Sequence, residues 1–130
     1  MNSNPLVSIV TPVYNQEKFI GETMQSVISQ SYQNWELLVV DDCSTDGSWD
    51  IIQEYARKDD RIRAFRNEKN KGLIPNWKFL IDNSKGEYLA FLEGDDVFCK
   101  ENLTEKMIIF SKYSDLGMVY CDFKIIDGGG

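Results

Sequence analysis

Two short apolar segments of the sequence end abruptly in carboxylates, and this feature constrains the fold more than any other. Residues 88–92 lead directly into Glu-Gly-Asp-Asp at 93–96, and residues 37–40 lead into Asp-Asp at 41–42. Each apolar segment has the length and composition of a strand buried in a parallel sheet. Charges inside such a core are costly unless they are paired or bound to a metal. We therefore expect the acids at the carboxyl ends of two neighbouring strands, the edge where open α/β sheets bind ligands.

Strand-like and helix-like segments alternate along the whole chain. The expected strands are residues 6–10, 35–40, 62–65, 88–92 and 118–126, and the expected helices lie within residues 15–28, 48–56, 75–81 and 103–110. Asn15 is a candidate cap for the first helix. This alternation predicts a single α/β domain, residues 1–130, with a mostly parallel central sheet flanked by helices. Because the last expected strand lies close to the end of the sequence, we expect a C-terminal truncation, although a small natural domain is the alternative.

Composition excludes several classes of protein. The net charge of -7 argues against nucleic acid or an anionic membrane as partner. No apolar run reaches the roughly 18 residues of a membrane span. The three cysteines, Cys43, Cys99 and Cys121, form no Cys-x-x-Cys pair, so a disulfide framework or zinc site is not expected and a cytoplasmic location fits. Because the chain has no histidine, acid–base chemistry falls to carboxylates, and any metal must be a hard cation that accepts oxygen ligands.

Four motifs occur in order within residues 7–15, 39–48, 70–76 and 86–96. Together they closely resemble the family 2 glycosyltransferases, inverting enzymes with a Rossmann-like GT-A fold for nucleotide-diphospho-sugars. The resemblance implies a metal-dependent transfer of a sugar from a nucleoside-diphosphate sugar to the hydroxyl of a sugar or lipid-linked sugar acceptor. It also implies a role in the synthesis of a cell-surface polysaccharide or glycan. In the full-length protein, a position at the inner face of the membrane is expected.

The resemblance also implies which residues bind the nucleotide. They are Thr11, Pro12, Val13, Tyr14, Asp42, Gly72, Asn76 and Gly94. Residues 11–15 are expected as a loop after the first strand, with Tyr14 packed against the base or, alternatively, against the first helix. Asp42 resembles the carboxylate that accepts a hydrogen bond from the ring N–H of the base, which favours a UDP-sugar, with dTDP second. For Asp41 the expected role is to cap the turn at residues 44–48.

Residues 93–96 resemble the Asp-x-Asp motif of the family, with Glu93 in place of the first acid. Asp95 matches the acid that binds the divalent cation, Mn²⁺ or Mg²⁺, and Asp96 and Glu93 are further candidate ligands. Glu93 could instead contact the ribose or cap the turn. One or two protein carboxylates suffice for such a cation, because phosphates and water complete its shell.

The catalytic base of the resembling family follows the fifth strand, and no motif of this sequence matches it. Asp122 and Asp127 are late carboxylates outside any such motif, so the base stays unknown and this chain alone is expected to bind donor without efficient transfer. One alternative is a catalytically silent nucleotide-sugar-binding domain. Another is a magnesium-binding receiver domain, but this would need a lysine after the last strand, whereas Lys124 lies inside it. A dinucleotide-binding domain would need Gly-x-Gly-x-x-Gly after the first strand.

Overall fold

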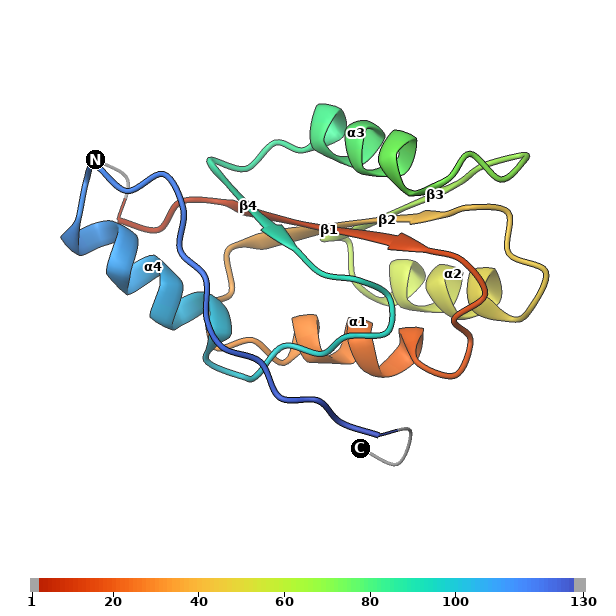
Figure 1. Cartoon of the computed structure of the whole chain (residues 1–130), viewed down its shortest axis with the longest axis horizontal. Helices are drawn as coiled ribbons and strands as arrows, with labels where there is room; N and C mark the ends of the chain where they lie inside the picture. The colour runs from red at the N-terminus through yellow and green to blue at the C-terminus, as the bar shows by residue number, and fades with distance from the viewer. Residues whose placement is uncertain (1–2, 128–130) are drawn as a thin grey trace.

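A four-stranded parallel sheet with the strand order β3-β2-β1-β4 forms the centre of the molecule (Figure 1). The computed structural model describes residues 3–127. The strands are β1 (Val7–Val13), β2 (Trp35–Asp41), β3 (Ile62–Arg66) and β4 (Tyr88–Phe91). The helices are α1 (Ile20–Ile28), α2 (Ser48–Lys58), α3 (Leu73–Asn83) and α4 (Asn102–Lys112). The predicted α/β class and the four expected β-α units up to α4 are confirmed.

The two central strands are buried on both faces, as expected for a parallel sheet between helices. Side chains alternate between the faces of a strand, so Ile9 packs in the larger cluster with residues of α1 and α2. Val10 packs on the other face with Leu38 and with Leu80 of α3. Figure 1 shows this arrangement, with α3 on one side of the sheet and α1 and α2 on the other.

The first strand extends further than predicted. Residues 11–13 were expected in a loop but belong to β1, and all three are buried. Proline is tolerated at position 12 because β1 pairs with β4 only as far as Val10, so that Pro12 lies beyond the end of β4. The ligand-facing loop therefore begins at Tyr14.

The prediction of a strand at residues 118–126 is wrong. These residues form no regular element, and Met118, Tyr120, Phe123 and Ile125 are largely exposed. A strand forms only where a neighbouring strand accepts its backbone hydrogen bonds, and within residues 3–127 this segment is paired with none. Among these described residues there is also no helix long and apolar enough to cross a membrane.

Gly86, just before β4, allows a close contact between two parts of the backbone. A Cβ at this position would lie 2.6 Å from the backbone nitrogen of Ser8 and 2.8 Å from the carbonyl oxygen of Leu6. We expect Gly86→Ala to destabilise the protein by about 1–3 kcal/mol, the usual cost of overpacking, because backbone cannot move aside as a side chain can. Gly117→Ala is the control, since a Cβ there meets nothing within 4 Å. Urea denaturation measures both variants, and equal stability would contradict this packing.

Candidate nucleotide-binding site

The predicted site residues meet at the carboxyl edge of the sheet because all four strands run in the same direction. Tyr14 follows β1, Asp42 follows β2, and the acidic turn at residues 93–96 follows β4. The sequence suggested that the two strands that end in acids are neighbours. This prediction is wrong, because β1 lies between β2 and β4. The edge therefore has three parts, with Tyr14 between the two groups of carboxylates in strand order.

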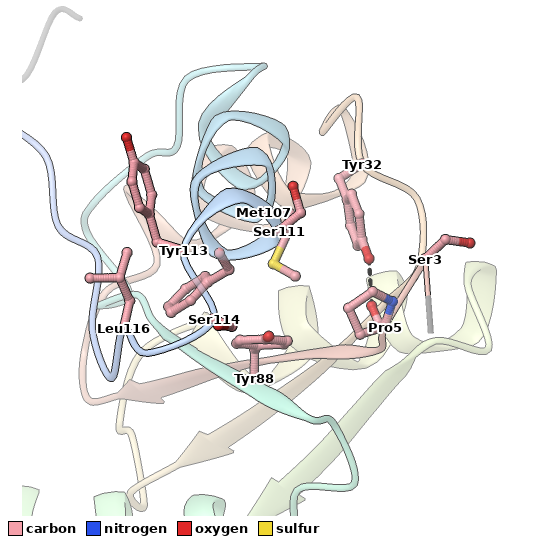
Figure 2. A pocket seen from close by; sticks show the side chains of 10 residues that line it. Ser3, Pro5, Tyr32, Tyr88, Met107, Ser111, Tyr113, Ser114 and Leu116 are labelled. Atoms are coloured by element: carbon pink, nitrogen blue, oxygen red, sulfur yellow. Dashed lines mark hydrogen bonds between the residues drawn. The ribbon is translucent and has the colours of Figure 1, made fainter. Parts of the chain in front are cut away.

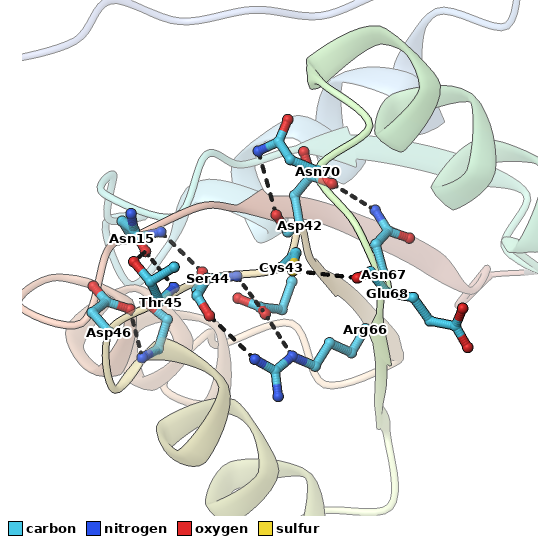
Figure 3. Close-up of polar contacts among 12 residues, drawn as sticks. Asn15, Asp42, Cys43, Ser44, Thr45, Asp46, Arg66, Asn67, Glu68 and Asn70 are labelled. Carbon is cyan, nitrogen blue, oxygen red and sulfur yellow. Dashed lines mark hydrogen bonds and ion pairs between the residues drawn. The ribbon is translucent and has the colours of Figure 1, made fainter.

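The loops after β1 and β2 are hydrogen-bonded to each other (Figure 3). The Asn15 side-chain oxygen accepts from the backbone N–H of Thr45 at 2.8 Å, and the Asn15 N–H donates to the Ser44 hydroxyl at 2.9 Å. The Gln16 N–H likewise donates to the Ser48 hydroxyl at 2.8 Å. Asn15 has a φ of 51°, in the left-handed region that asparagine tolerates. The prediction that Asn15 caps the first helix is wrong, because α1 begins only at Ile20 and Asn15 instead joins the two loops.

Tyr14 is the first exposed residue after β1, with 49% of its surface accessible. It stands on a loop fixed by the hydrogen bonds of its neighbour Asn15, so its exposed ring is carried by an ordered part of the backbone at the edge of the sheet. An exposed aromatic face on a rigid loop can stack on a nucleotide base. The loop follows directly on the buried end of β1, which consists of Thr11, Pro12 and Val13.

Asp41 is the last residue of β2 and Asp42 follows it, and the two carboxylates have different surroundings. Asp41 is fully buried, and its Oδ2 accepts from the Ser44 N–H at 3.1 Å and lies 3.3 Å from Nε of Arg66. This confirms that Asp41 caps the turn after β2. The Arg66 guanidinium also donates to the Ser44 carbonyl, which ties β3 to the same turn (Figure 3).

Asp42 is only 3% exposed and holds the loop that follows β3. Its Oδ1 accepts from the Asn67 side-chain amide and the Lys71 N–H, both at 2.8 Å, and its Oδ2 accepts from the Gly72 N–H at 2.9 Å. Burial alone would raise the pKa of Asp42, but the hydrogen bonds from Lys71, Asn67 and Gly72, with the nearby Asn76 amide, outweigh it and lower the pKa below its ordinary value. Asp42 is therefore a carboxylate anion.

Gly72 and Asn76 belong to the hydrogen-bond network around Asp42. Gly72 has a φ of 86°, a conformation that favours glycine, and it directs its N–H at Asp42 just before α3 begins. Asn76, in α3, is 3% exposed and accepts from the Asn67 amide at 2.7 Å. Asn67 was not identified from the sequence, since it lies outside the four motifs and only its position after β3 hints at the ligand edge.

The acidic turn after β4 can hold a cation. Glu93, Asp95 and Asp96 are exposed and can each offer one carboxylate oxygen, all within 4.8 Å of one another. Oxygen ligands of an octahedral Mg²⁺ lie about 2.1 Å from the ion, and hence up to roughly 4.2 Å apart, so small side-chain rotations suffice. The hard oxygen donors thus fit Mg²⁺ or Mn²⁺.

Helix α1 fixes the position of this turn. The Thr23 hydroxyl donates to the carbonyl oxygen of Gly94 at 3.0 Å, and Thr23 is almost fully buried. A Cβ on Gly94 would overlap the side-chain oxygen of Gln16, so glycine lets the turn lie close against the loop after β1. The same loop therefore supports both Tyr14 and the acidic turn.

A cavity of about 320 Å³ lies away from this edge, between α4 and the start of β4 (Figure 2). Its walls include Tyr32, Tyr88 and Phe110, and the Tyr32 hydroxyl donates to the carbonyl oxygen of Pro5 at 2.5 Å. Among residues 3–127, no charged side chain lines this cavity. These residues therefore offer it none of the groups that a nucleoside diphosphate and its cation require.

The fold and its acidic edge define an α/β domain of the GT-A type, and comparison with known proteins gives the family. The family model "Glycosyl transferase family 2" matches residues 8–130. The chain belongs to glycosyltransferase family 2. It superposes on the crystal structure of S. aureus TarS 1-349 in complex with UDP-GlcNAc with a TM-score of 0.78 and 30% identity, covering 83% of this chain and 32% of that one.

Proteins with similar sequences that are named as glycosyltransferases support this assignment. The putative teichuronic acid biosynthesis glycosyltransferase TuaG of Bacillus subtilis is 42% identical over 82% of this chain and 42% of its own length. The UDP-Glc:alpha-D-GlcNAc-diphosphoundecaprenol beta-1,3-glucosyltransferase WfgD of Escherichia coli is 34% identical over 94% of this chain and 47% of its own length. The chain thus spans less than half of either relative.

Proposed function

We propose that this domain binds a UDP-sugar, with a dTDP-sugar as second choice, for transfer to the hydroxyl of a sugar or lipid-linked sugar. The observation that carries the proposal is the meeting of an exposed aromatic ring, an ionised buried carboxylate and three clustered acids at one edge of a family 2 domain. Tyr14 stacks on the base, and Asp42 accepts from its ring N–H. Complexes of TarS with UDP and UDP-GlcNAc support this choice of nucleotide.

The acidic turn supplies the cation site in this proposal. Asp95 is the principal ligand, with Asp96 and Glu93 completing the protein's share of the shell. These residues would hold Mn²⁺ or Mg²⁺, which when bound would supply positive charge to stabilise the leaving diphosphate. Gly94 lets the turn lie close against Gln16 of the loop after β1, and the Thr23 hydroxyl holds the turn beside the base site.

The acceptor and the catalytic base belong to the proposal as well. The inverting reaction is a single displacement in which a carboxylate takes the proton of the acceptor hydroxyl. We place this base outside the motifs of the present chain, in keeping with relatives more than twice its matched length. The name of TuaG supports a role in bacterial polysaccharide synthesis, and the name of WfgD supports a lipid-linked acceptor. We place this activity at the cytoplasmic face of the membrane.

A panel of nucleotides tests the proposed donor. Calorimetric titration with UDP, dTDP, GDP and ADP, each with and without Mn²⁺ or Mg²⁺, should give binding of UDP first and dTDP second, and only with the cation. Adenine presents no ring N–H to Asp42, so ADP should bind at least about tenfold more weakly, the worth of one hydrogen bond to a charged group. Equal affinity for UDP, GDP and ADP would remove Asp42 from base recognition.

A further inference from the structure

We propose that Asn67 is a positioning residue that sets base selectivity by occupying one of the acceptor positions on Asp42. This inference rests on the proposed function, because it assumes that Asp42 reads the base. Asn67 follows β3, and its side-chain amide bridges the carboxylate of Asp42 and the side-chain oxygen of Asn76 at 2.8 and 2.7 Å. Both hydrogens of that amide are thereby used. Figure 3 shows Asn67 beside Asp42.

The hydrogen bonds to Asp42 leave its two oxygens unequal. An ionised carboxylate offers about four acceptor positions, two on each oxygen. Oδ1 is filled by the Asn67 amide and the Lys71 N–H, whereas Oδ2 accepts from the Gly72 N–H. The Asn76 amide also lies near this carboxylate. Because Oδ1 is filled, a base that binds Asp42 must use Oδ2 alone.

When only Oδ2 of Asp42 can accept, the affinity for a base depends on how many adjacent N–H donors the base presents. Uracil and thymine offer a single ring N–H between two carbonyl groups, which one acceptor satisfies. Guanine offers a ring N–H beside an exocyclic amino group, and a carboxylate must use both oxygens to pair with the two. If Oδ1 is filled by Asn67 and Lys71, guanine buries a donor without a partner, and that is costly. Asn67 therefore disfavours guanine without contacting the base.

The experiment compares the ratio of UDP to GDP affinity in the wild type and in the variants Asn67→Leu and Asn67→Ala, with Mn²⁺ present. Leucine keeps the branched outline of asparagine, at a larger volume, without its donor, and alanine removes both the branches and the donor. Each variant frees a position on Oδ1, so GDP should gain relative to UDP and the ratio should narrow by roughly tenfold, the worth of one charged hydrogen bond. Thermal unfolding identifies the variants that are folded.

Asn70→Ala is the matched control, because the Asn70 amide reaches the main-chain carbonyl of Asp42 at 3.4 Å and not its carboxylate. It should keep the wild-type ratio. A purely structural role of Asn67 would weaken UDP and GDP equally and leave the ratio unchanged, which would overturn this inference while the proposed function stands. A wild type that shows no preference between UDP and GDP would overturn both.

Discussion

Replacing Asp95 with asparagine is expected to abolish the cation-dependent binding of UDP and to leave the fold intact. Asp95 is exposed on the turn after β4, so the substitution removes no core contact. Asparagine keeps the shape but loses the charge that a hard cation prefers. A charged interaction of this kind is worth more than a neutral hydrogen bond, so the dissociation constant for UDP with Mn²⁺ should rise by more than about tenfold.

Calorimetry with and without Mn²⁺ measures the effect, and circular dichroism checks the fold. Asp60→Asn is the control, because Asp60 is also exposed but precedes β3 and lies at the opposite edge of the sheet. Glu93→Gln and Asp96→Asn should each weaken binding less than Asp95→Asn. Undiminished Mn²⁺-dependent binding by a folded Asp95→Asn variant would place the cation elsewhere.

Removing the charge of Glu36, which lies away from the proposed site, is expected to cost stability. Glu36 lies near the start of β2, is 8% exposed, and accepts from the Ser8 hydroxyl and the Lys85 N–H, both at 2.7 Å. Its other oxygen lies 3.2 Å from the Arg63 guanidinium. One carboxylate thus joins β1, β2, β3 and the segment before β4.

Glu36→Gln should lower the free energy of unfolding at neutral pH by about 2 kcal/mol. This is less than the roughly 3–5 kcal/mol for breaking a fully buried pair, because Arg63 keeps contact with water and donates to the Asn83 carbonyl. Urea denaturation measures the loss. Glu54→Gln, which removes an exposed pair with Lys58, is the control and should change little.

The contribution of Glu36 should depend on pH. Burial raises the pKa of Glu36, but the hydrogen bonds from Ser8, Lys85 and Arg63 and the charge of Arg63 outweigh burial and lower it below the ordinary value of 4.5. A lowered pKa in the folded state stabilises the protein above the ordinary value, and this stabilisation is lost as the pH falls below it. The difference between wild type and Glu36→Gln should therefore shrink from neutral pH to about pH 3. A constant difference would show that the charge of Glu36 is not what stabilises the fold.

The sequence determined the elements and the edge at which the acids lie, because both depend on local patterns. Apolar runs ending in acids marked β2 and β4, and helical spacing of apolar residues marked the helices. The turn after β2 also followed from local chemistry, since Asp41 bonds a backbone N–H three residues away. Parallel direction then placed Tyr14, Asp42 and Asp95 at one edge.

Only the tertiary structure decided which groups face these residues, because their partners come from distant parts of the chain. Asp42 is held by Asn67, Lys71 and Gly72, all more than 20 residues away, and no local pattern reveals such pairing. The placement of β1 between β2 and β4 is likewise a result of long-range strand pairing. For the same reason the apolar residues 118–126 resembled a strand in sequence yet form none among the described residues. Alternation of side chains permits a strand, but only a neighbouring strand with free hydrogen-bonding groups makes one.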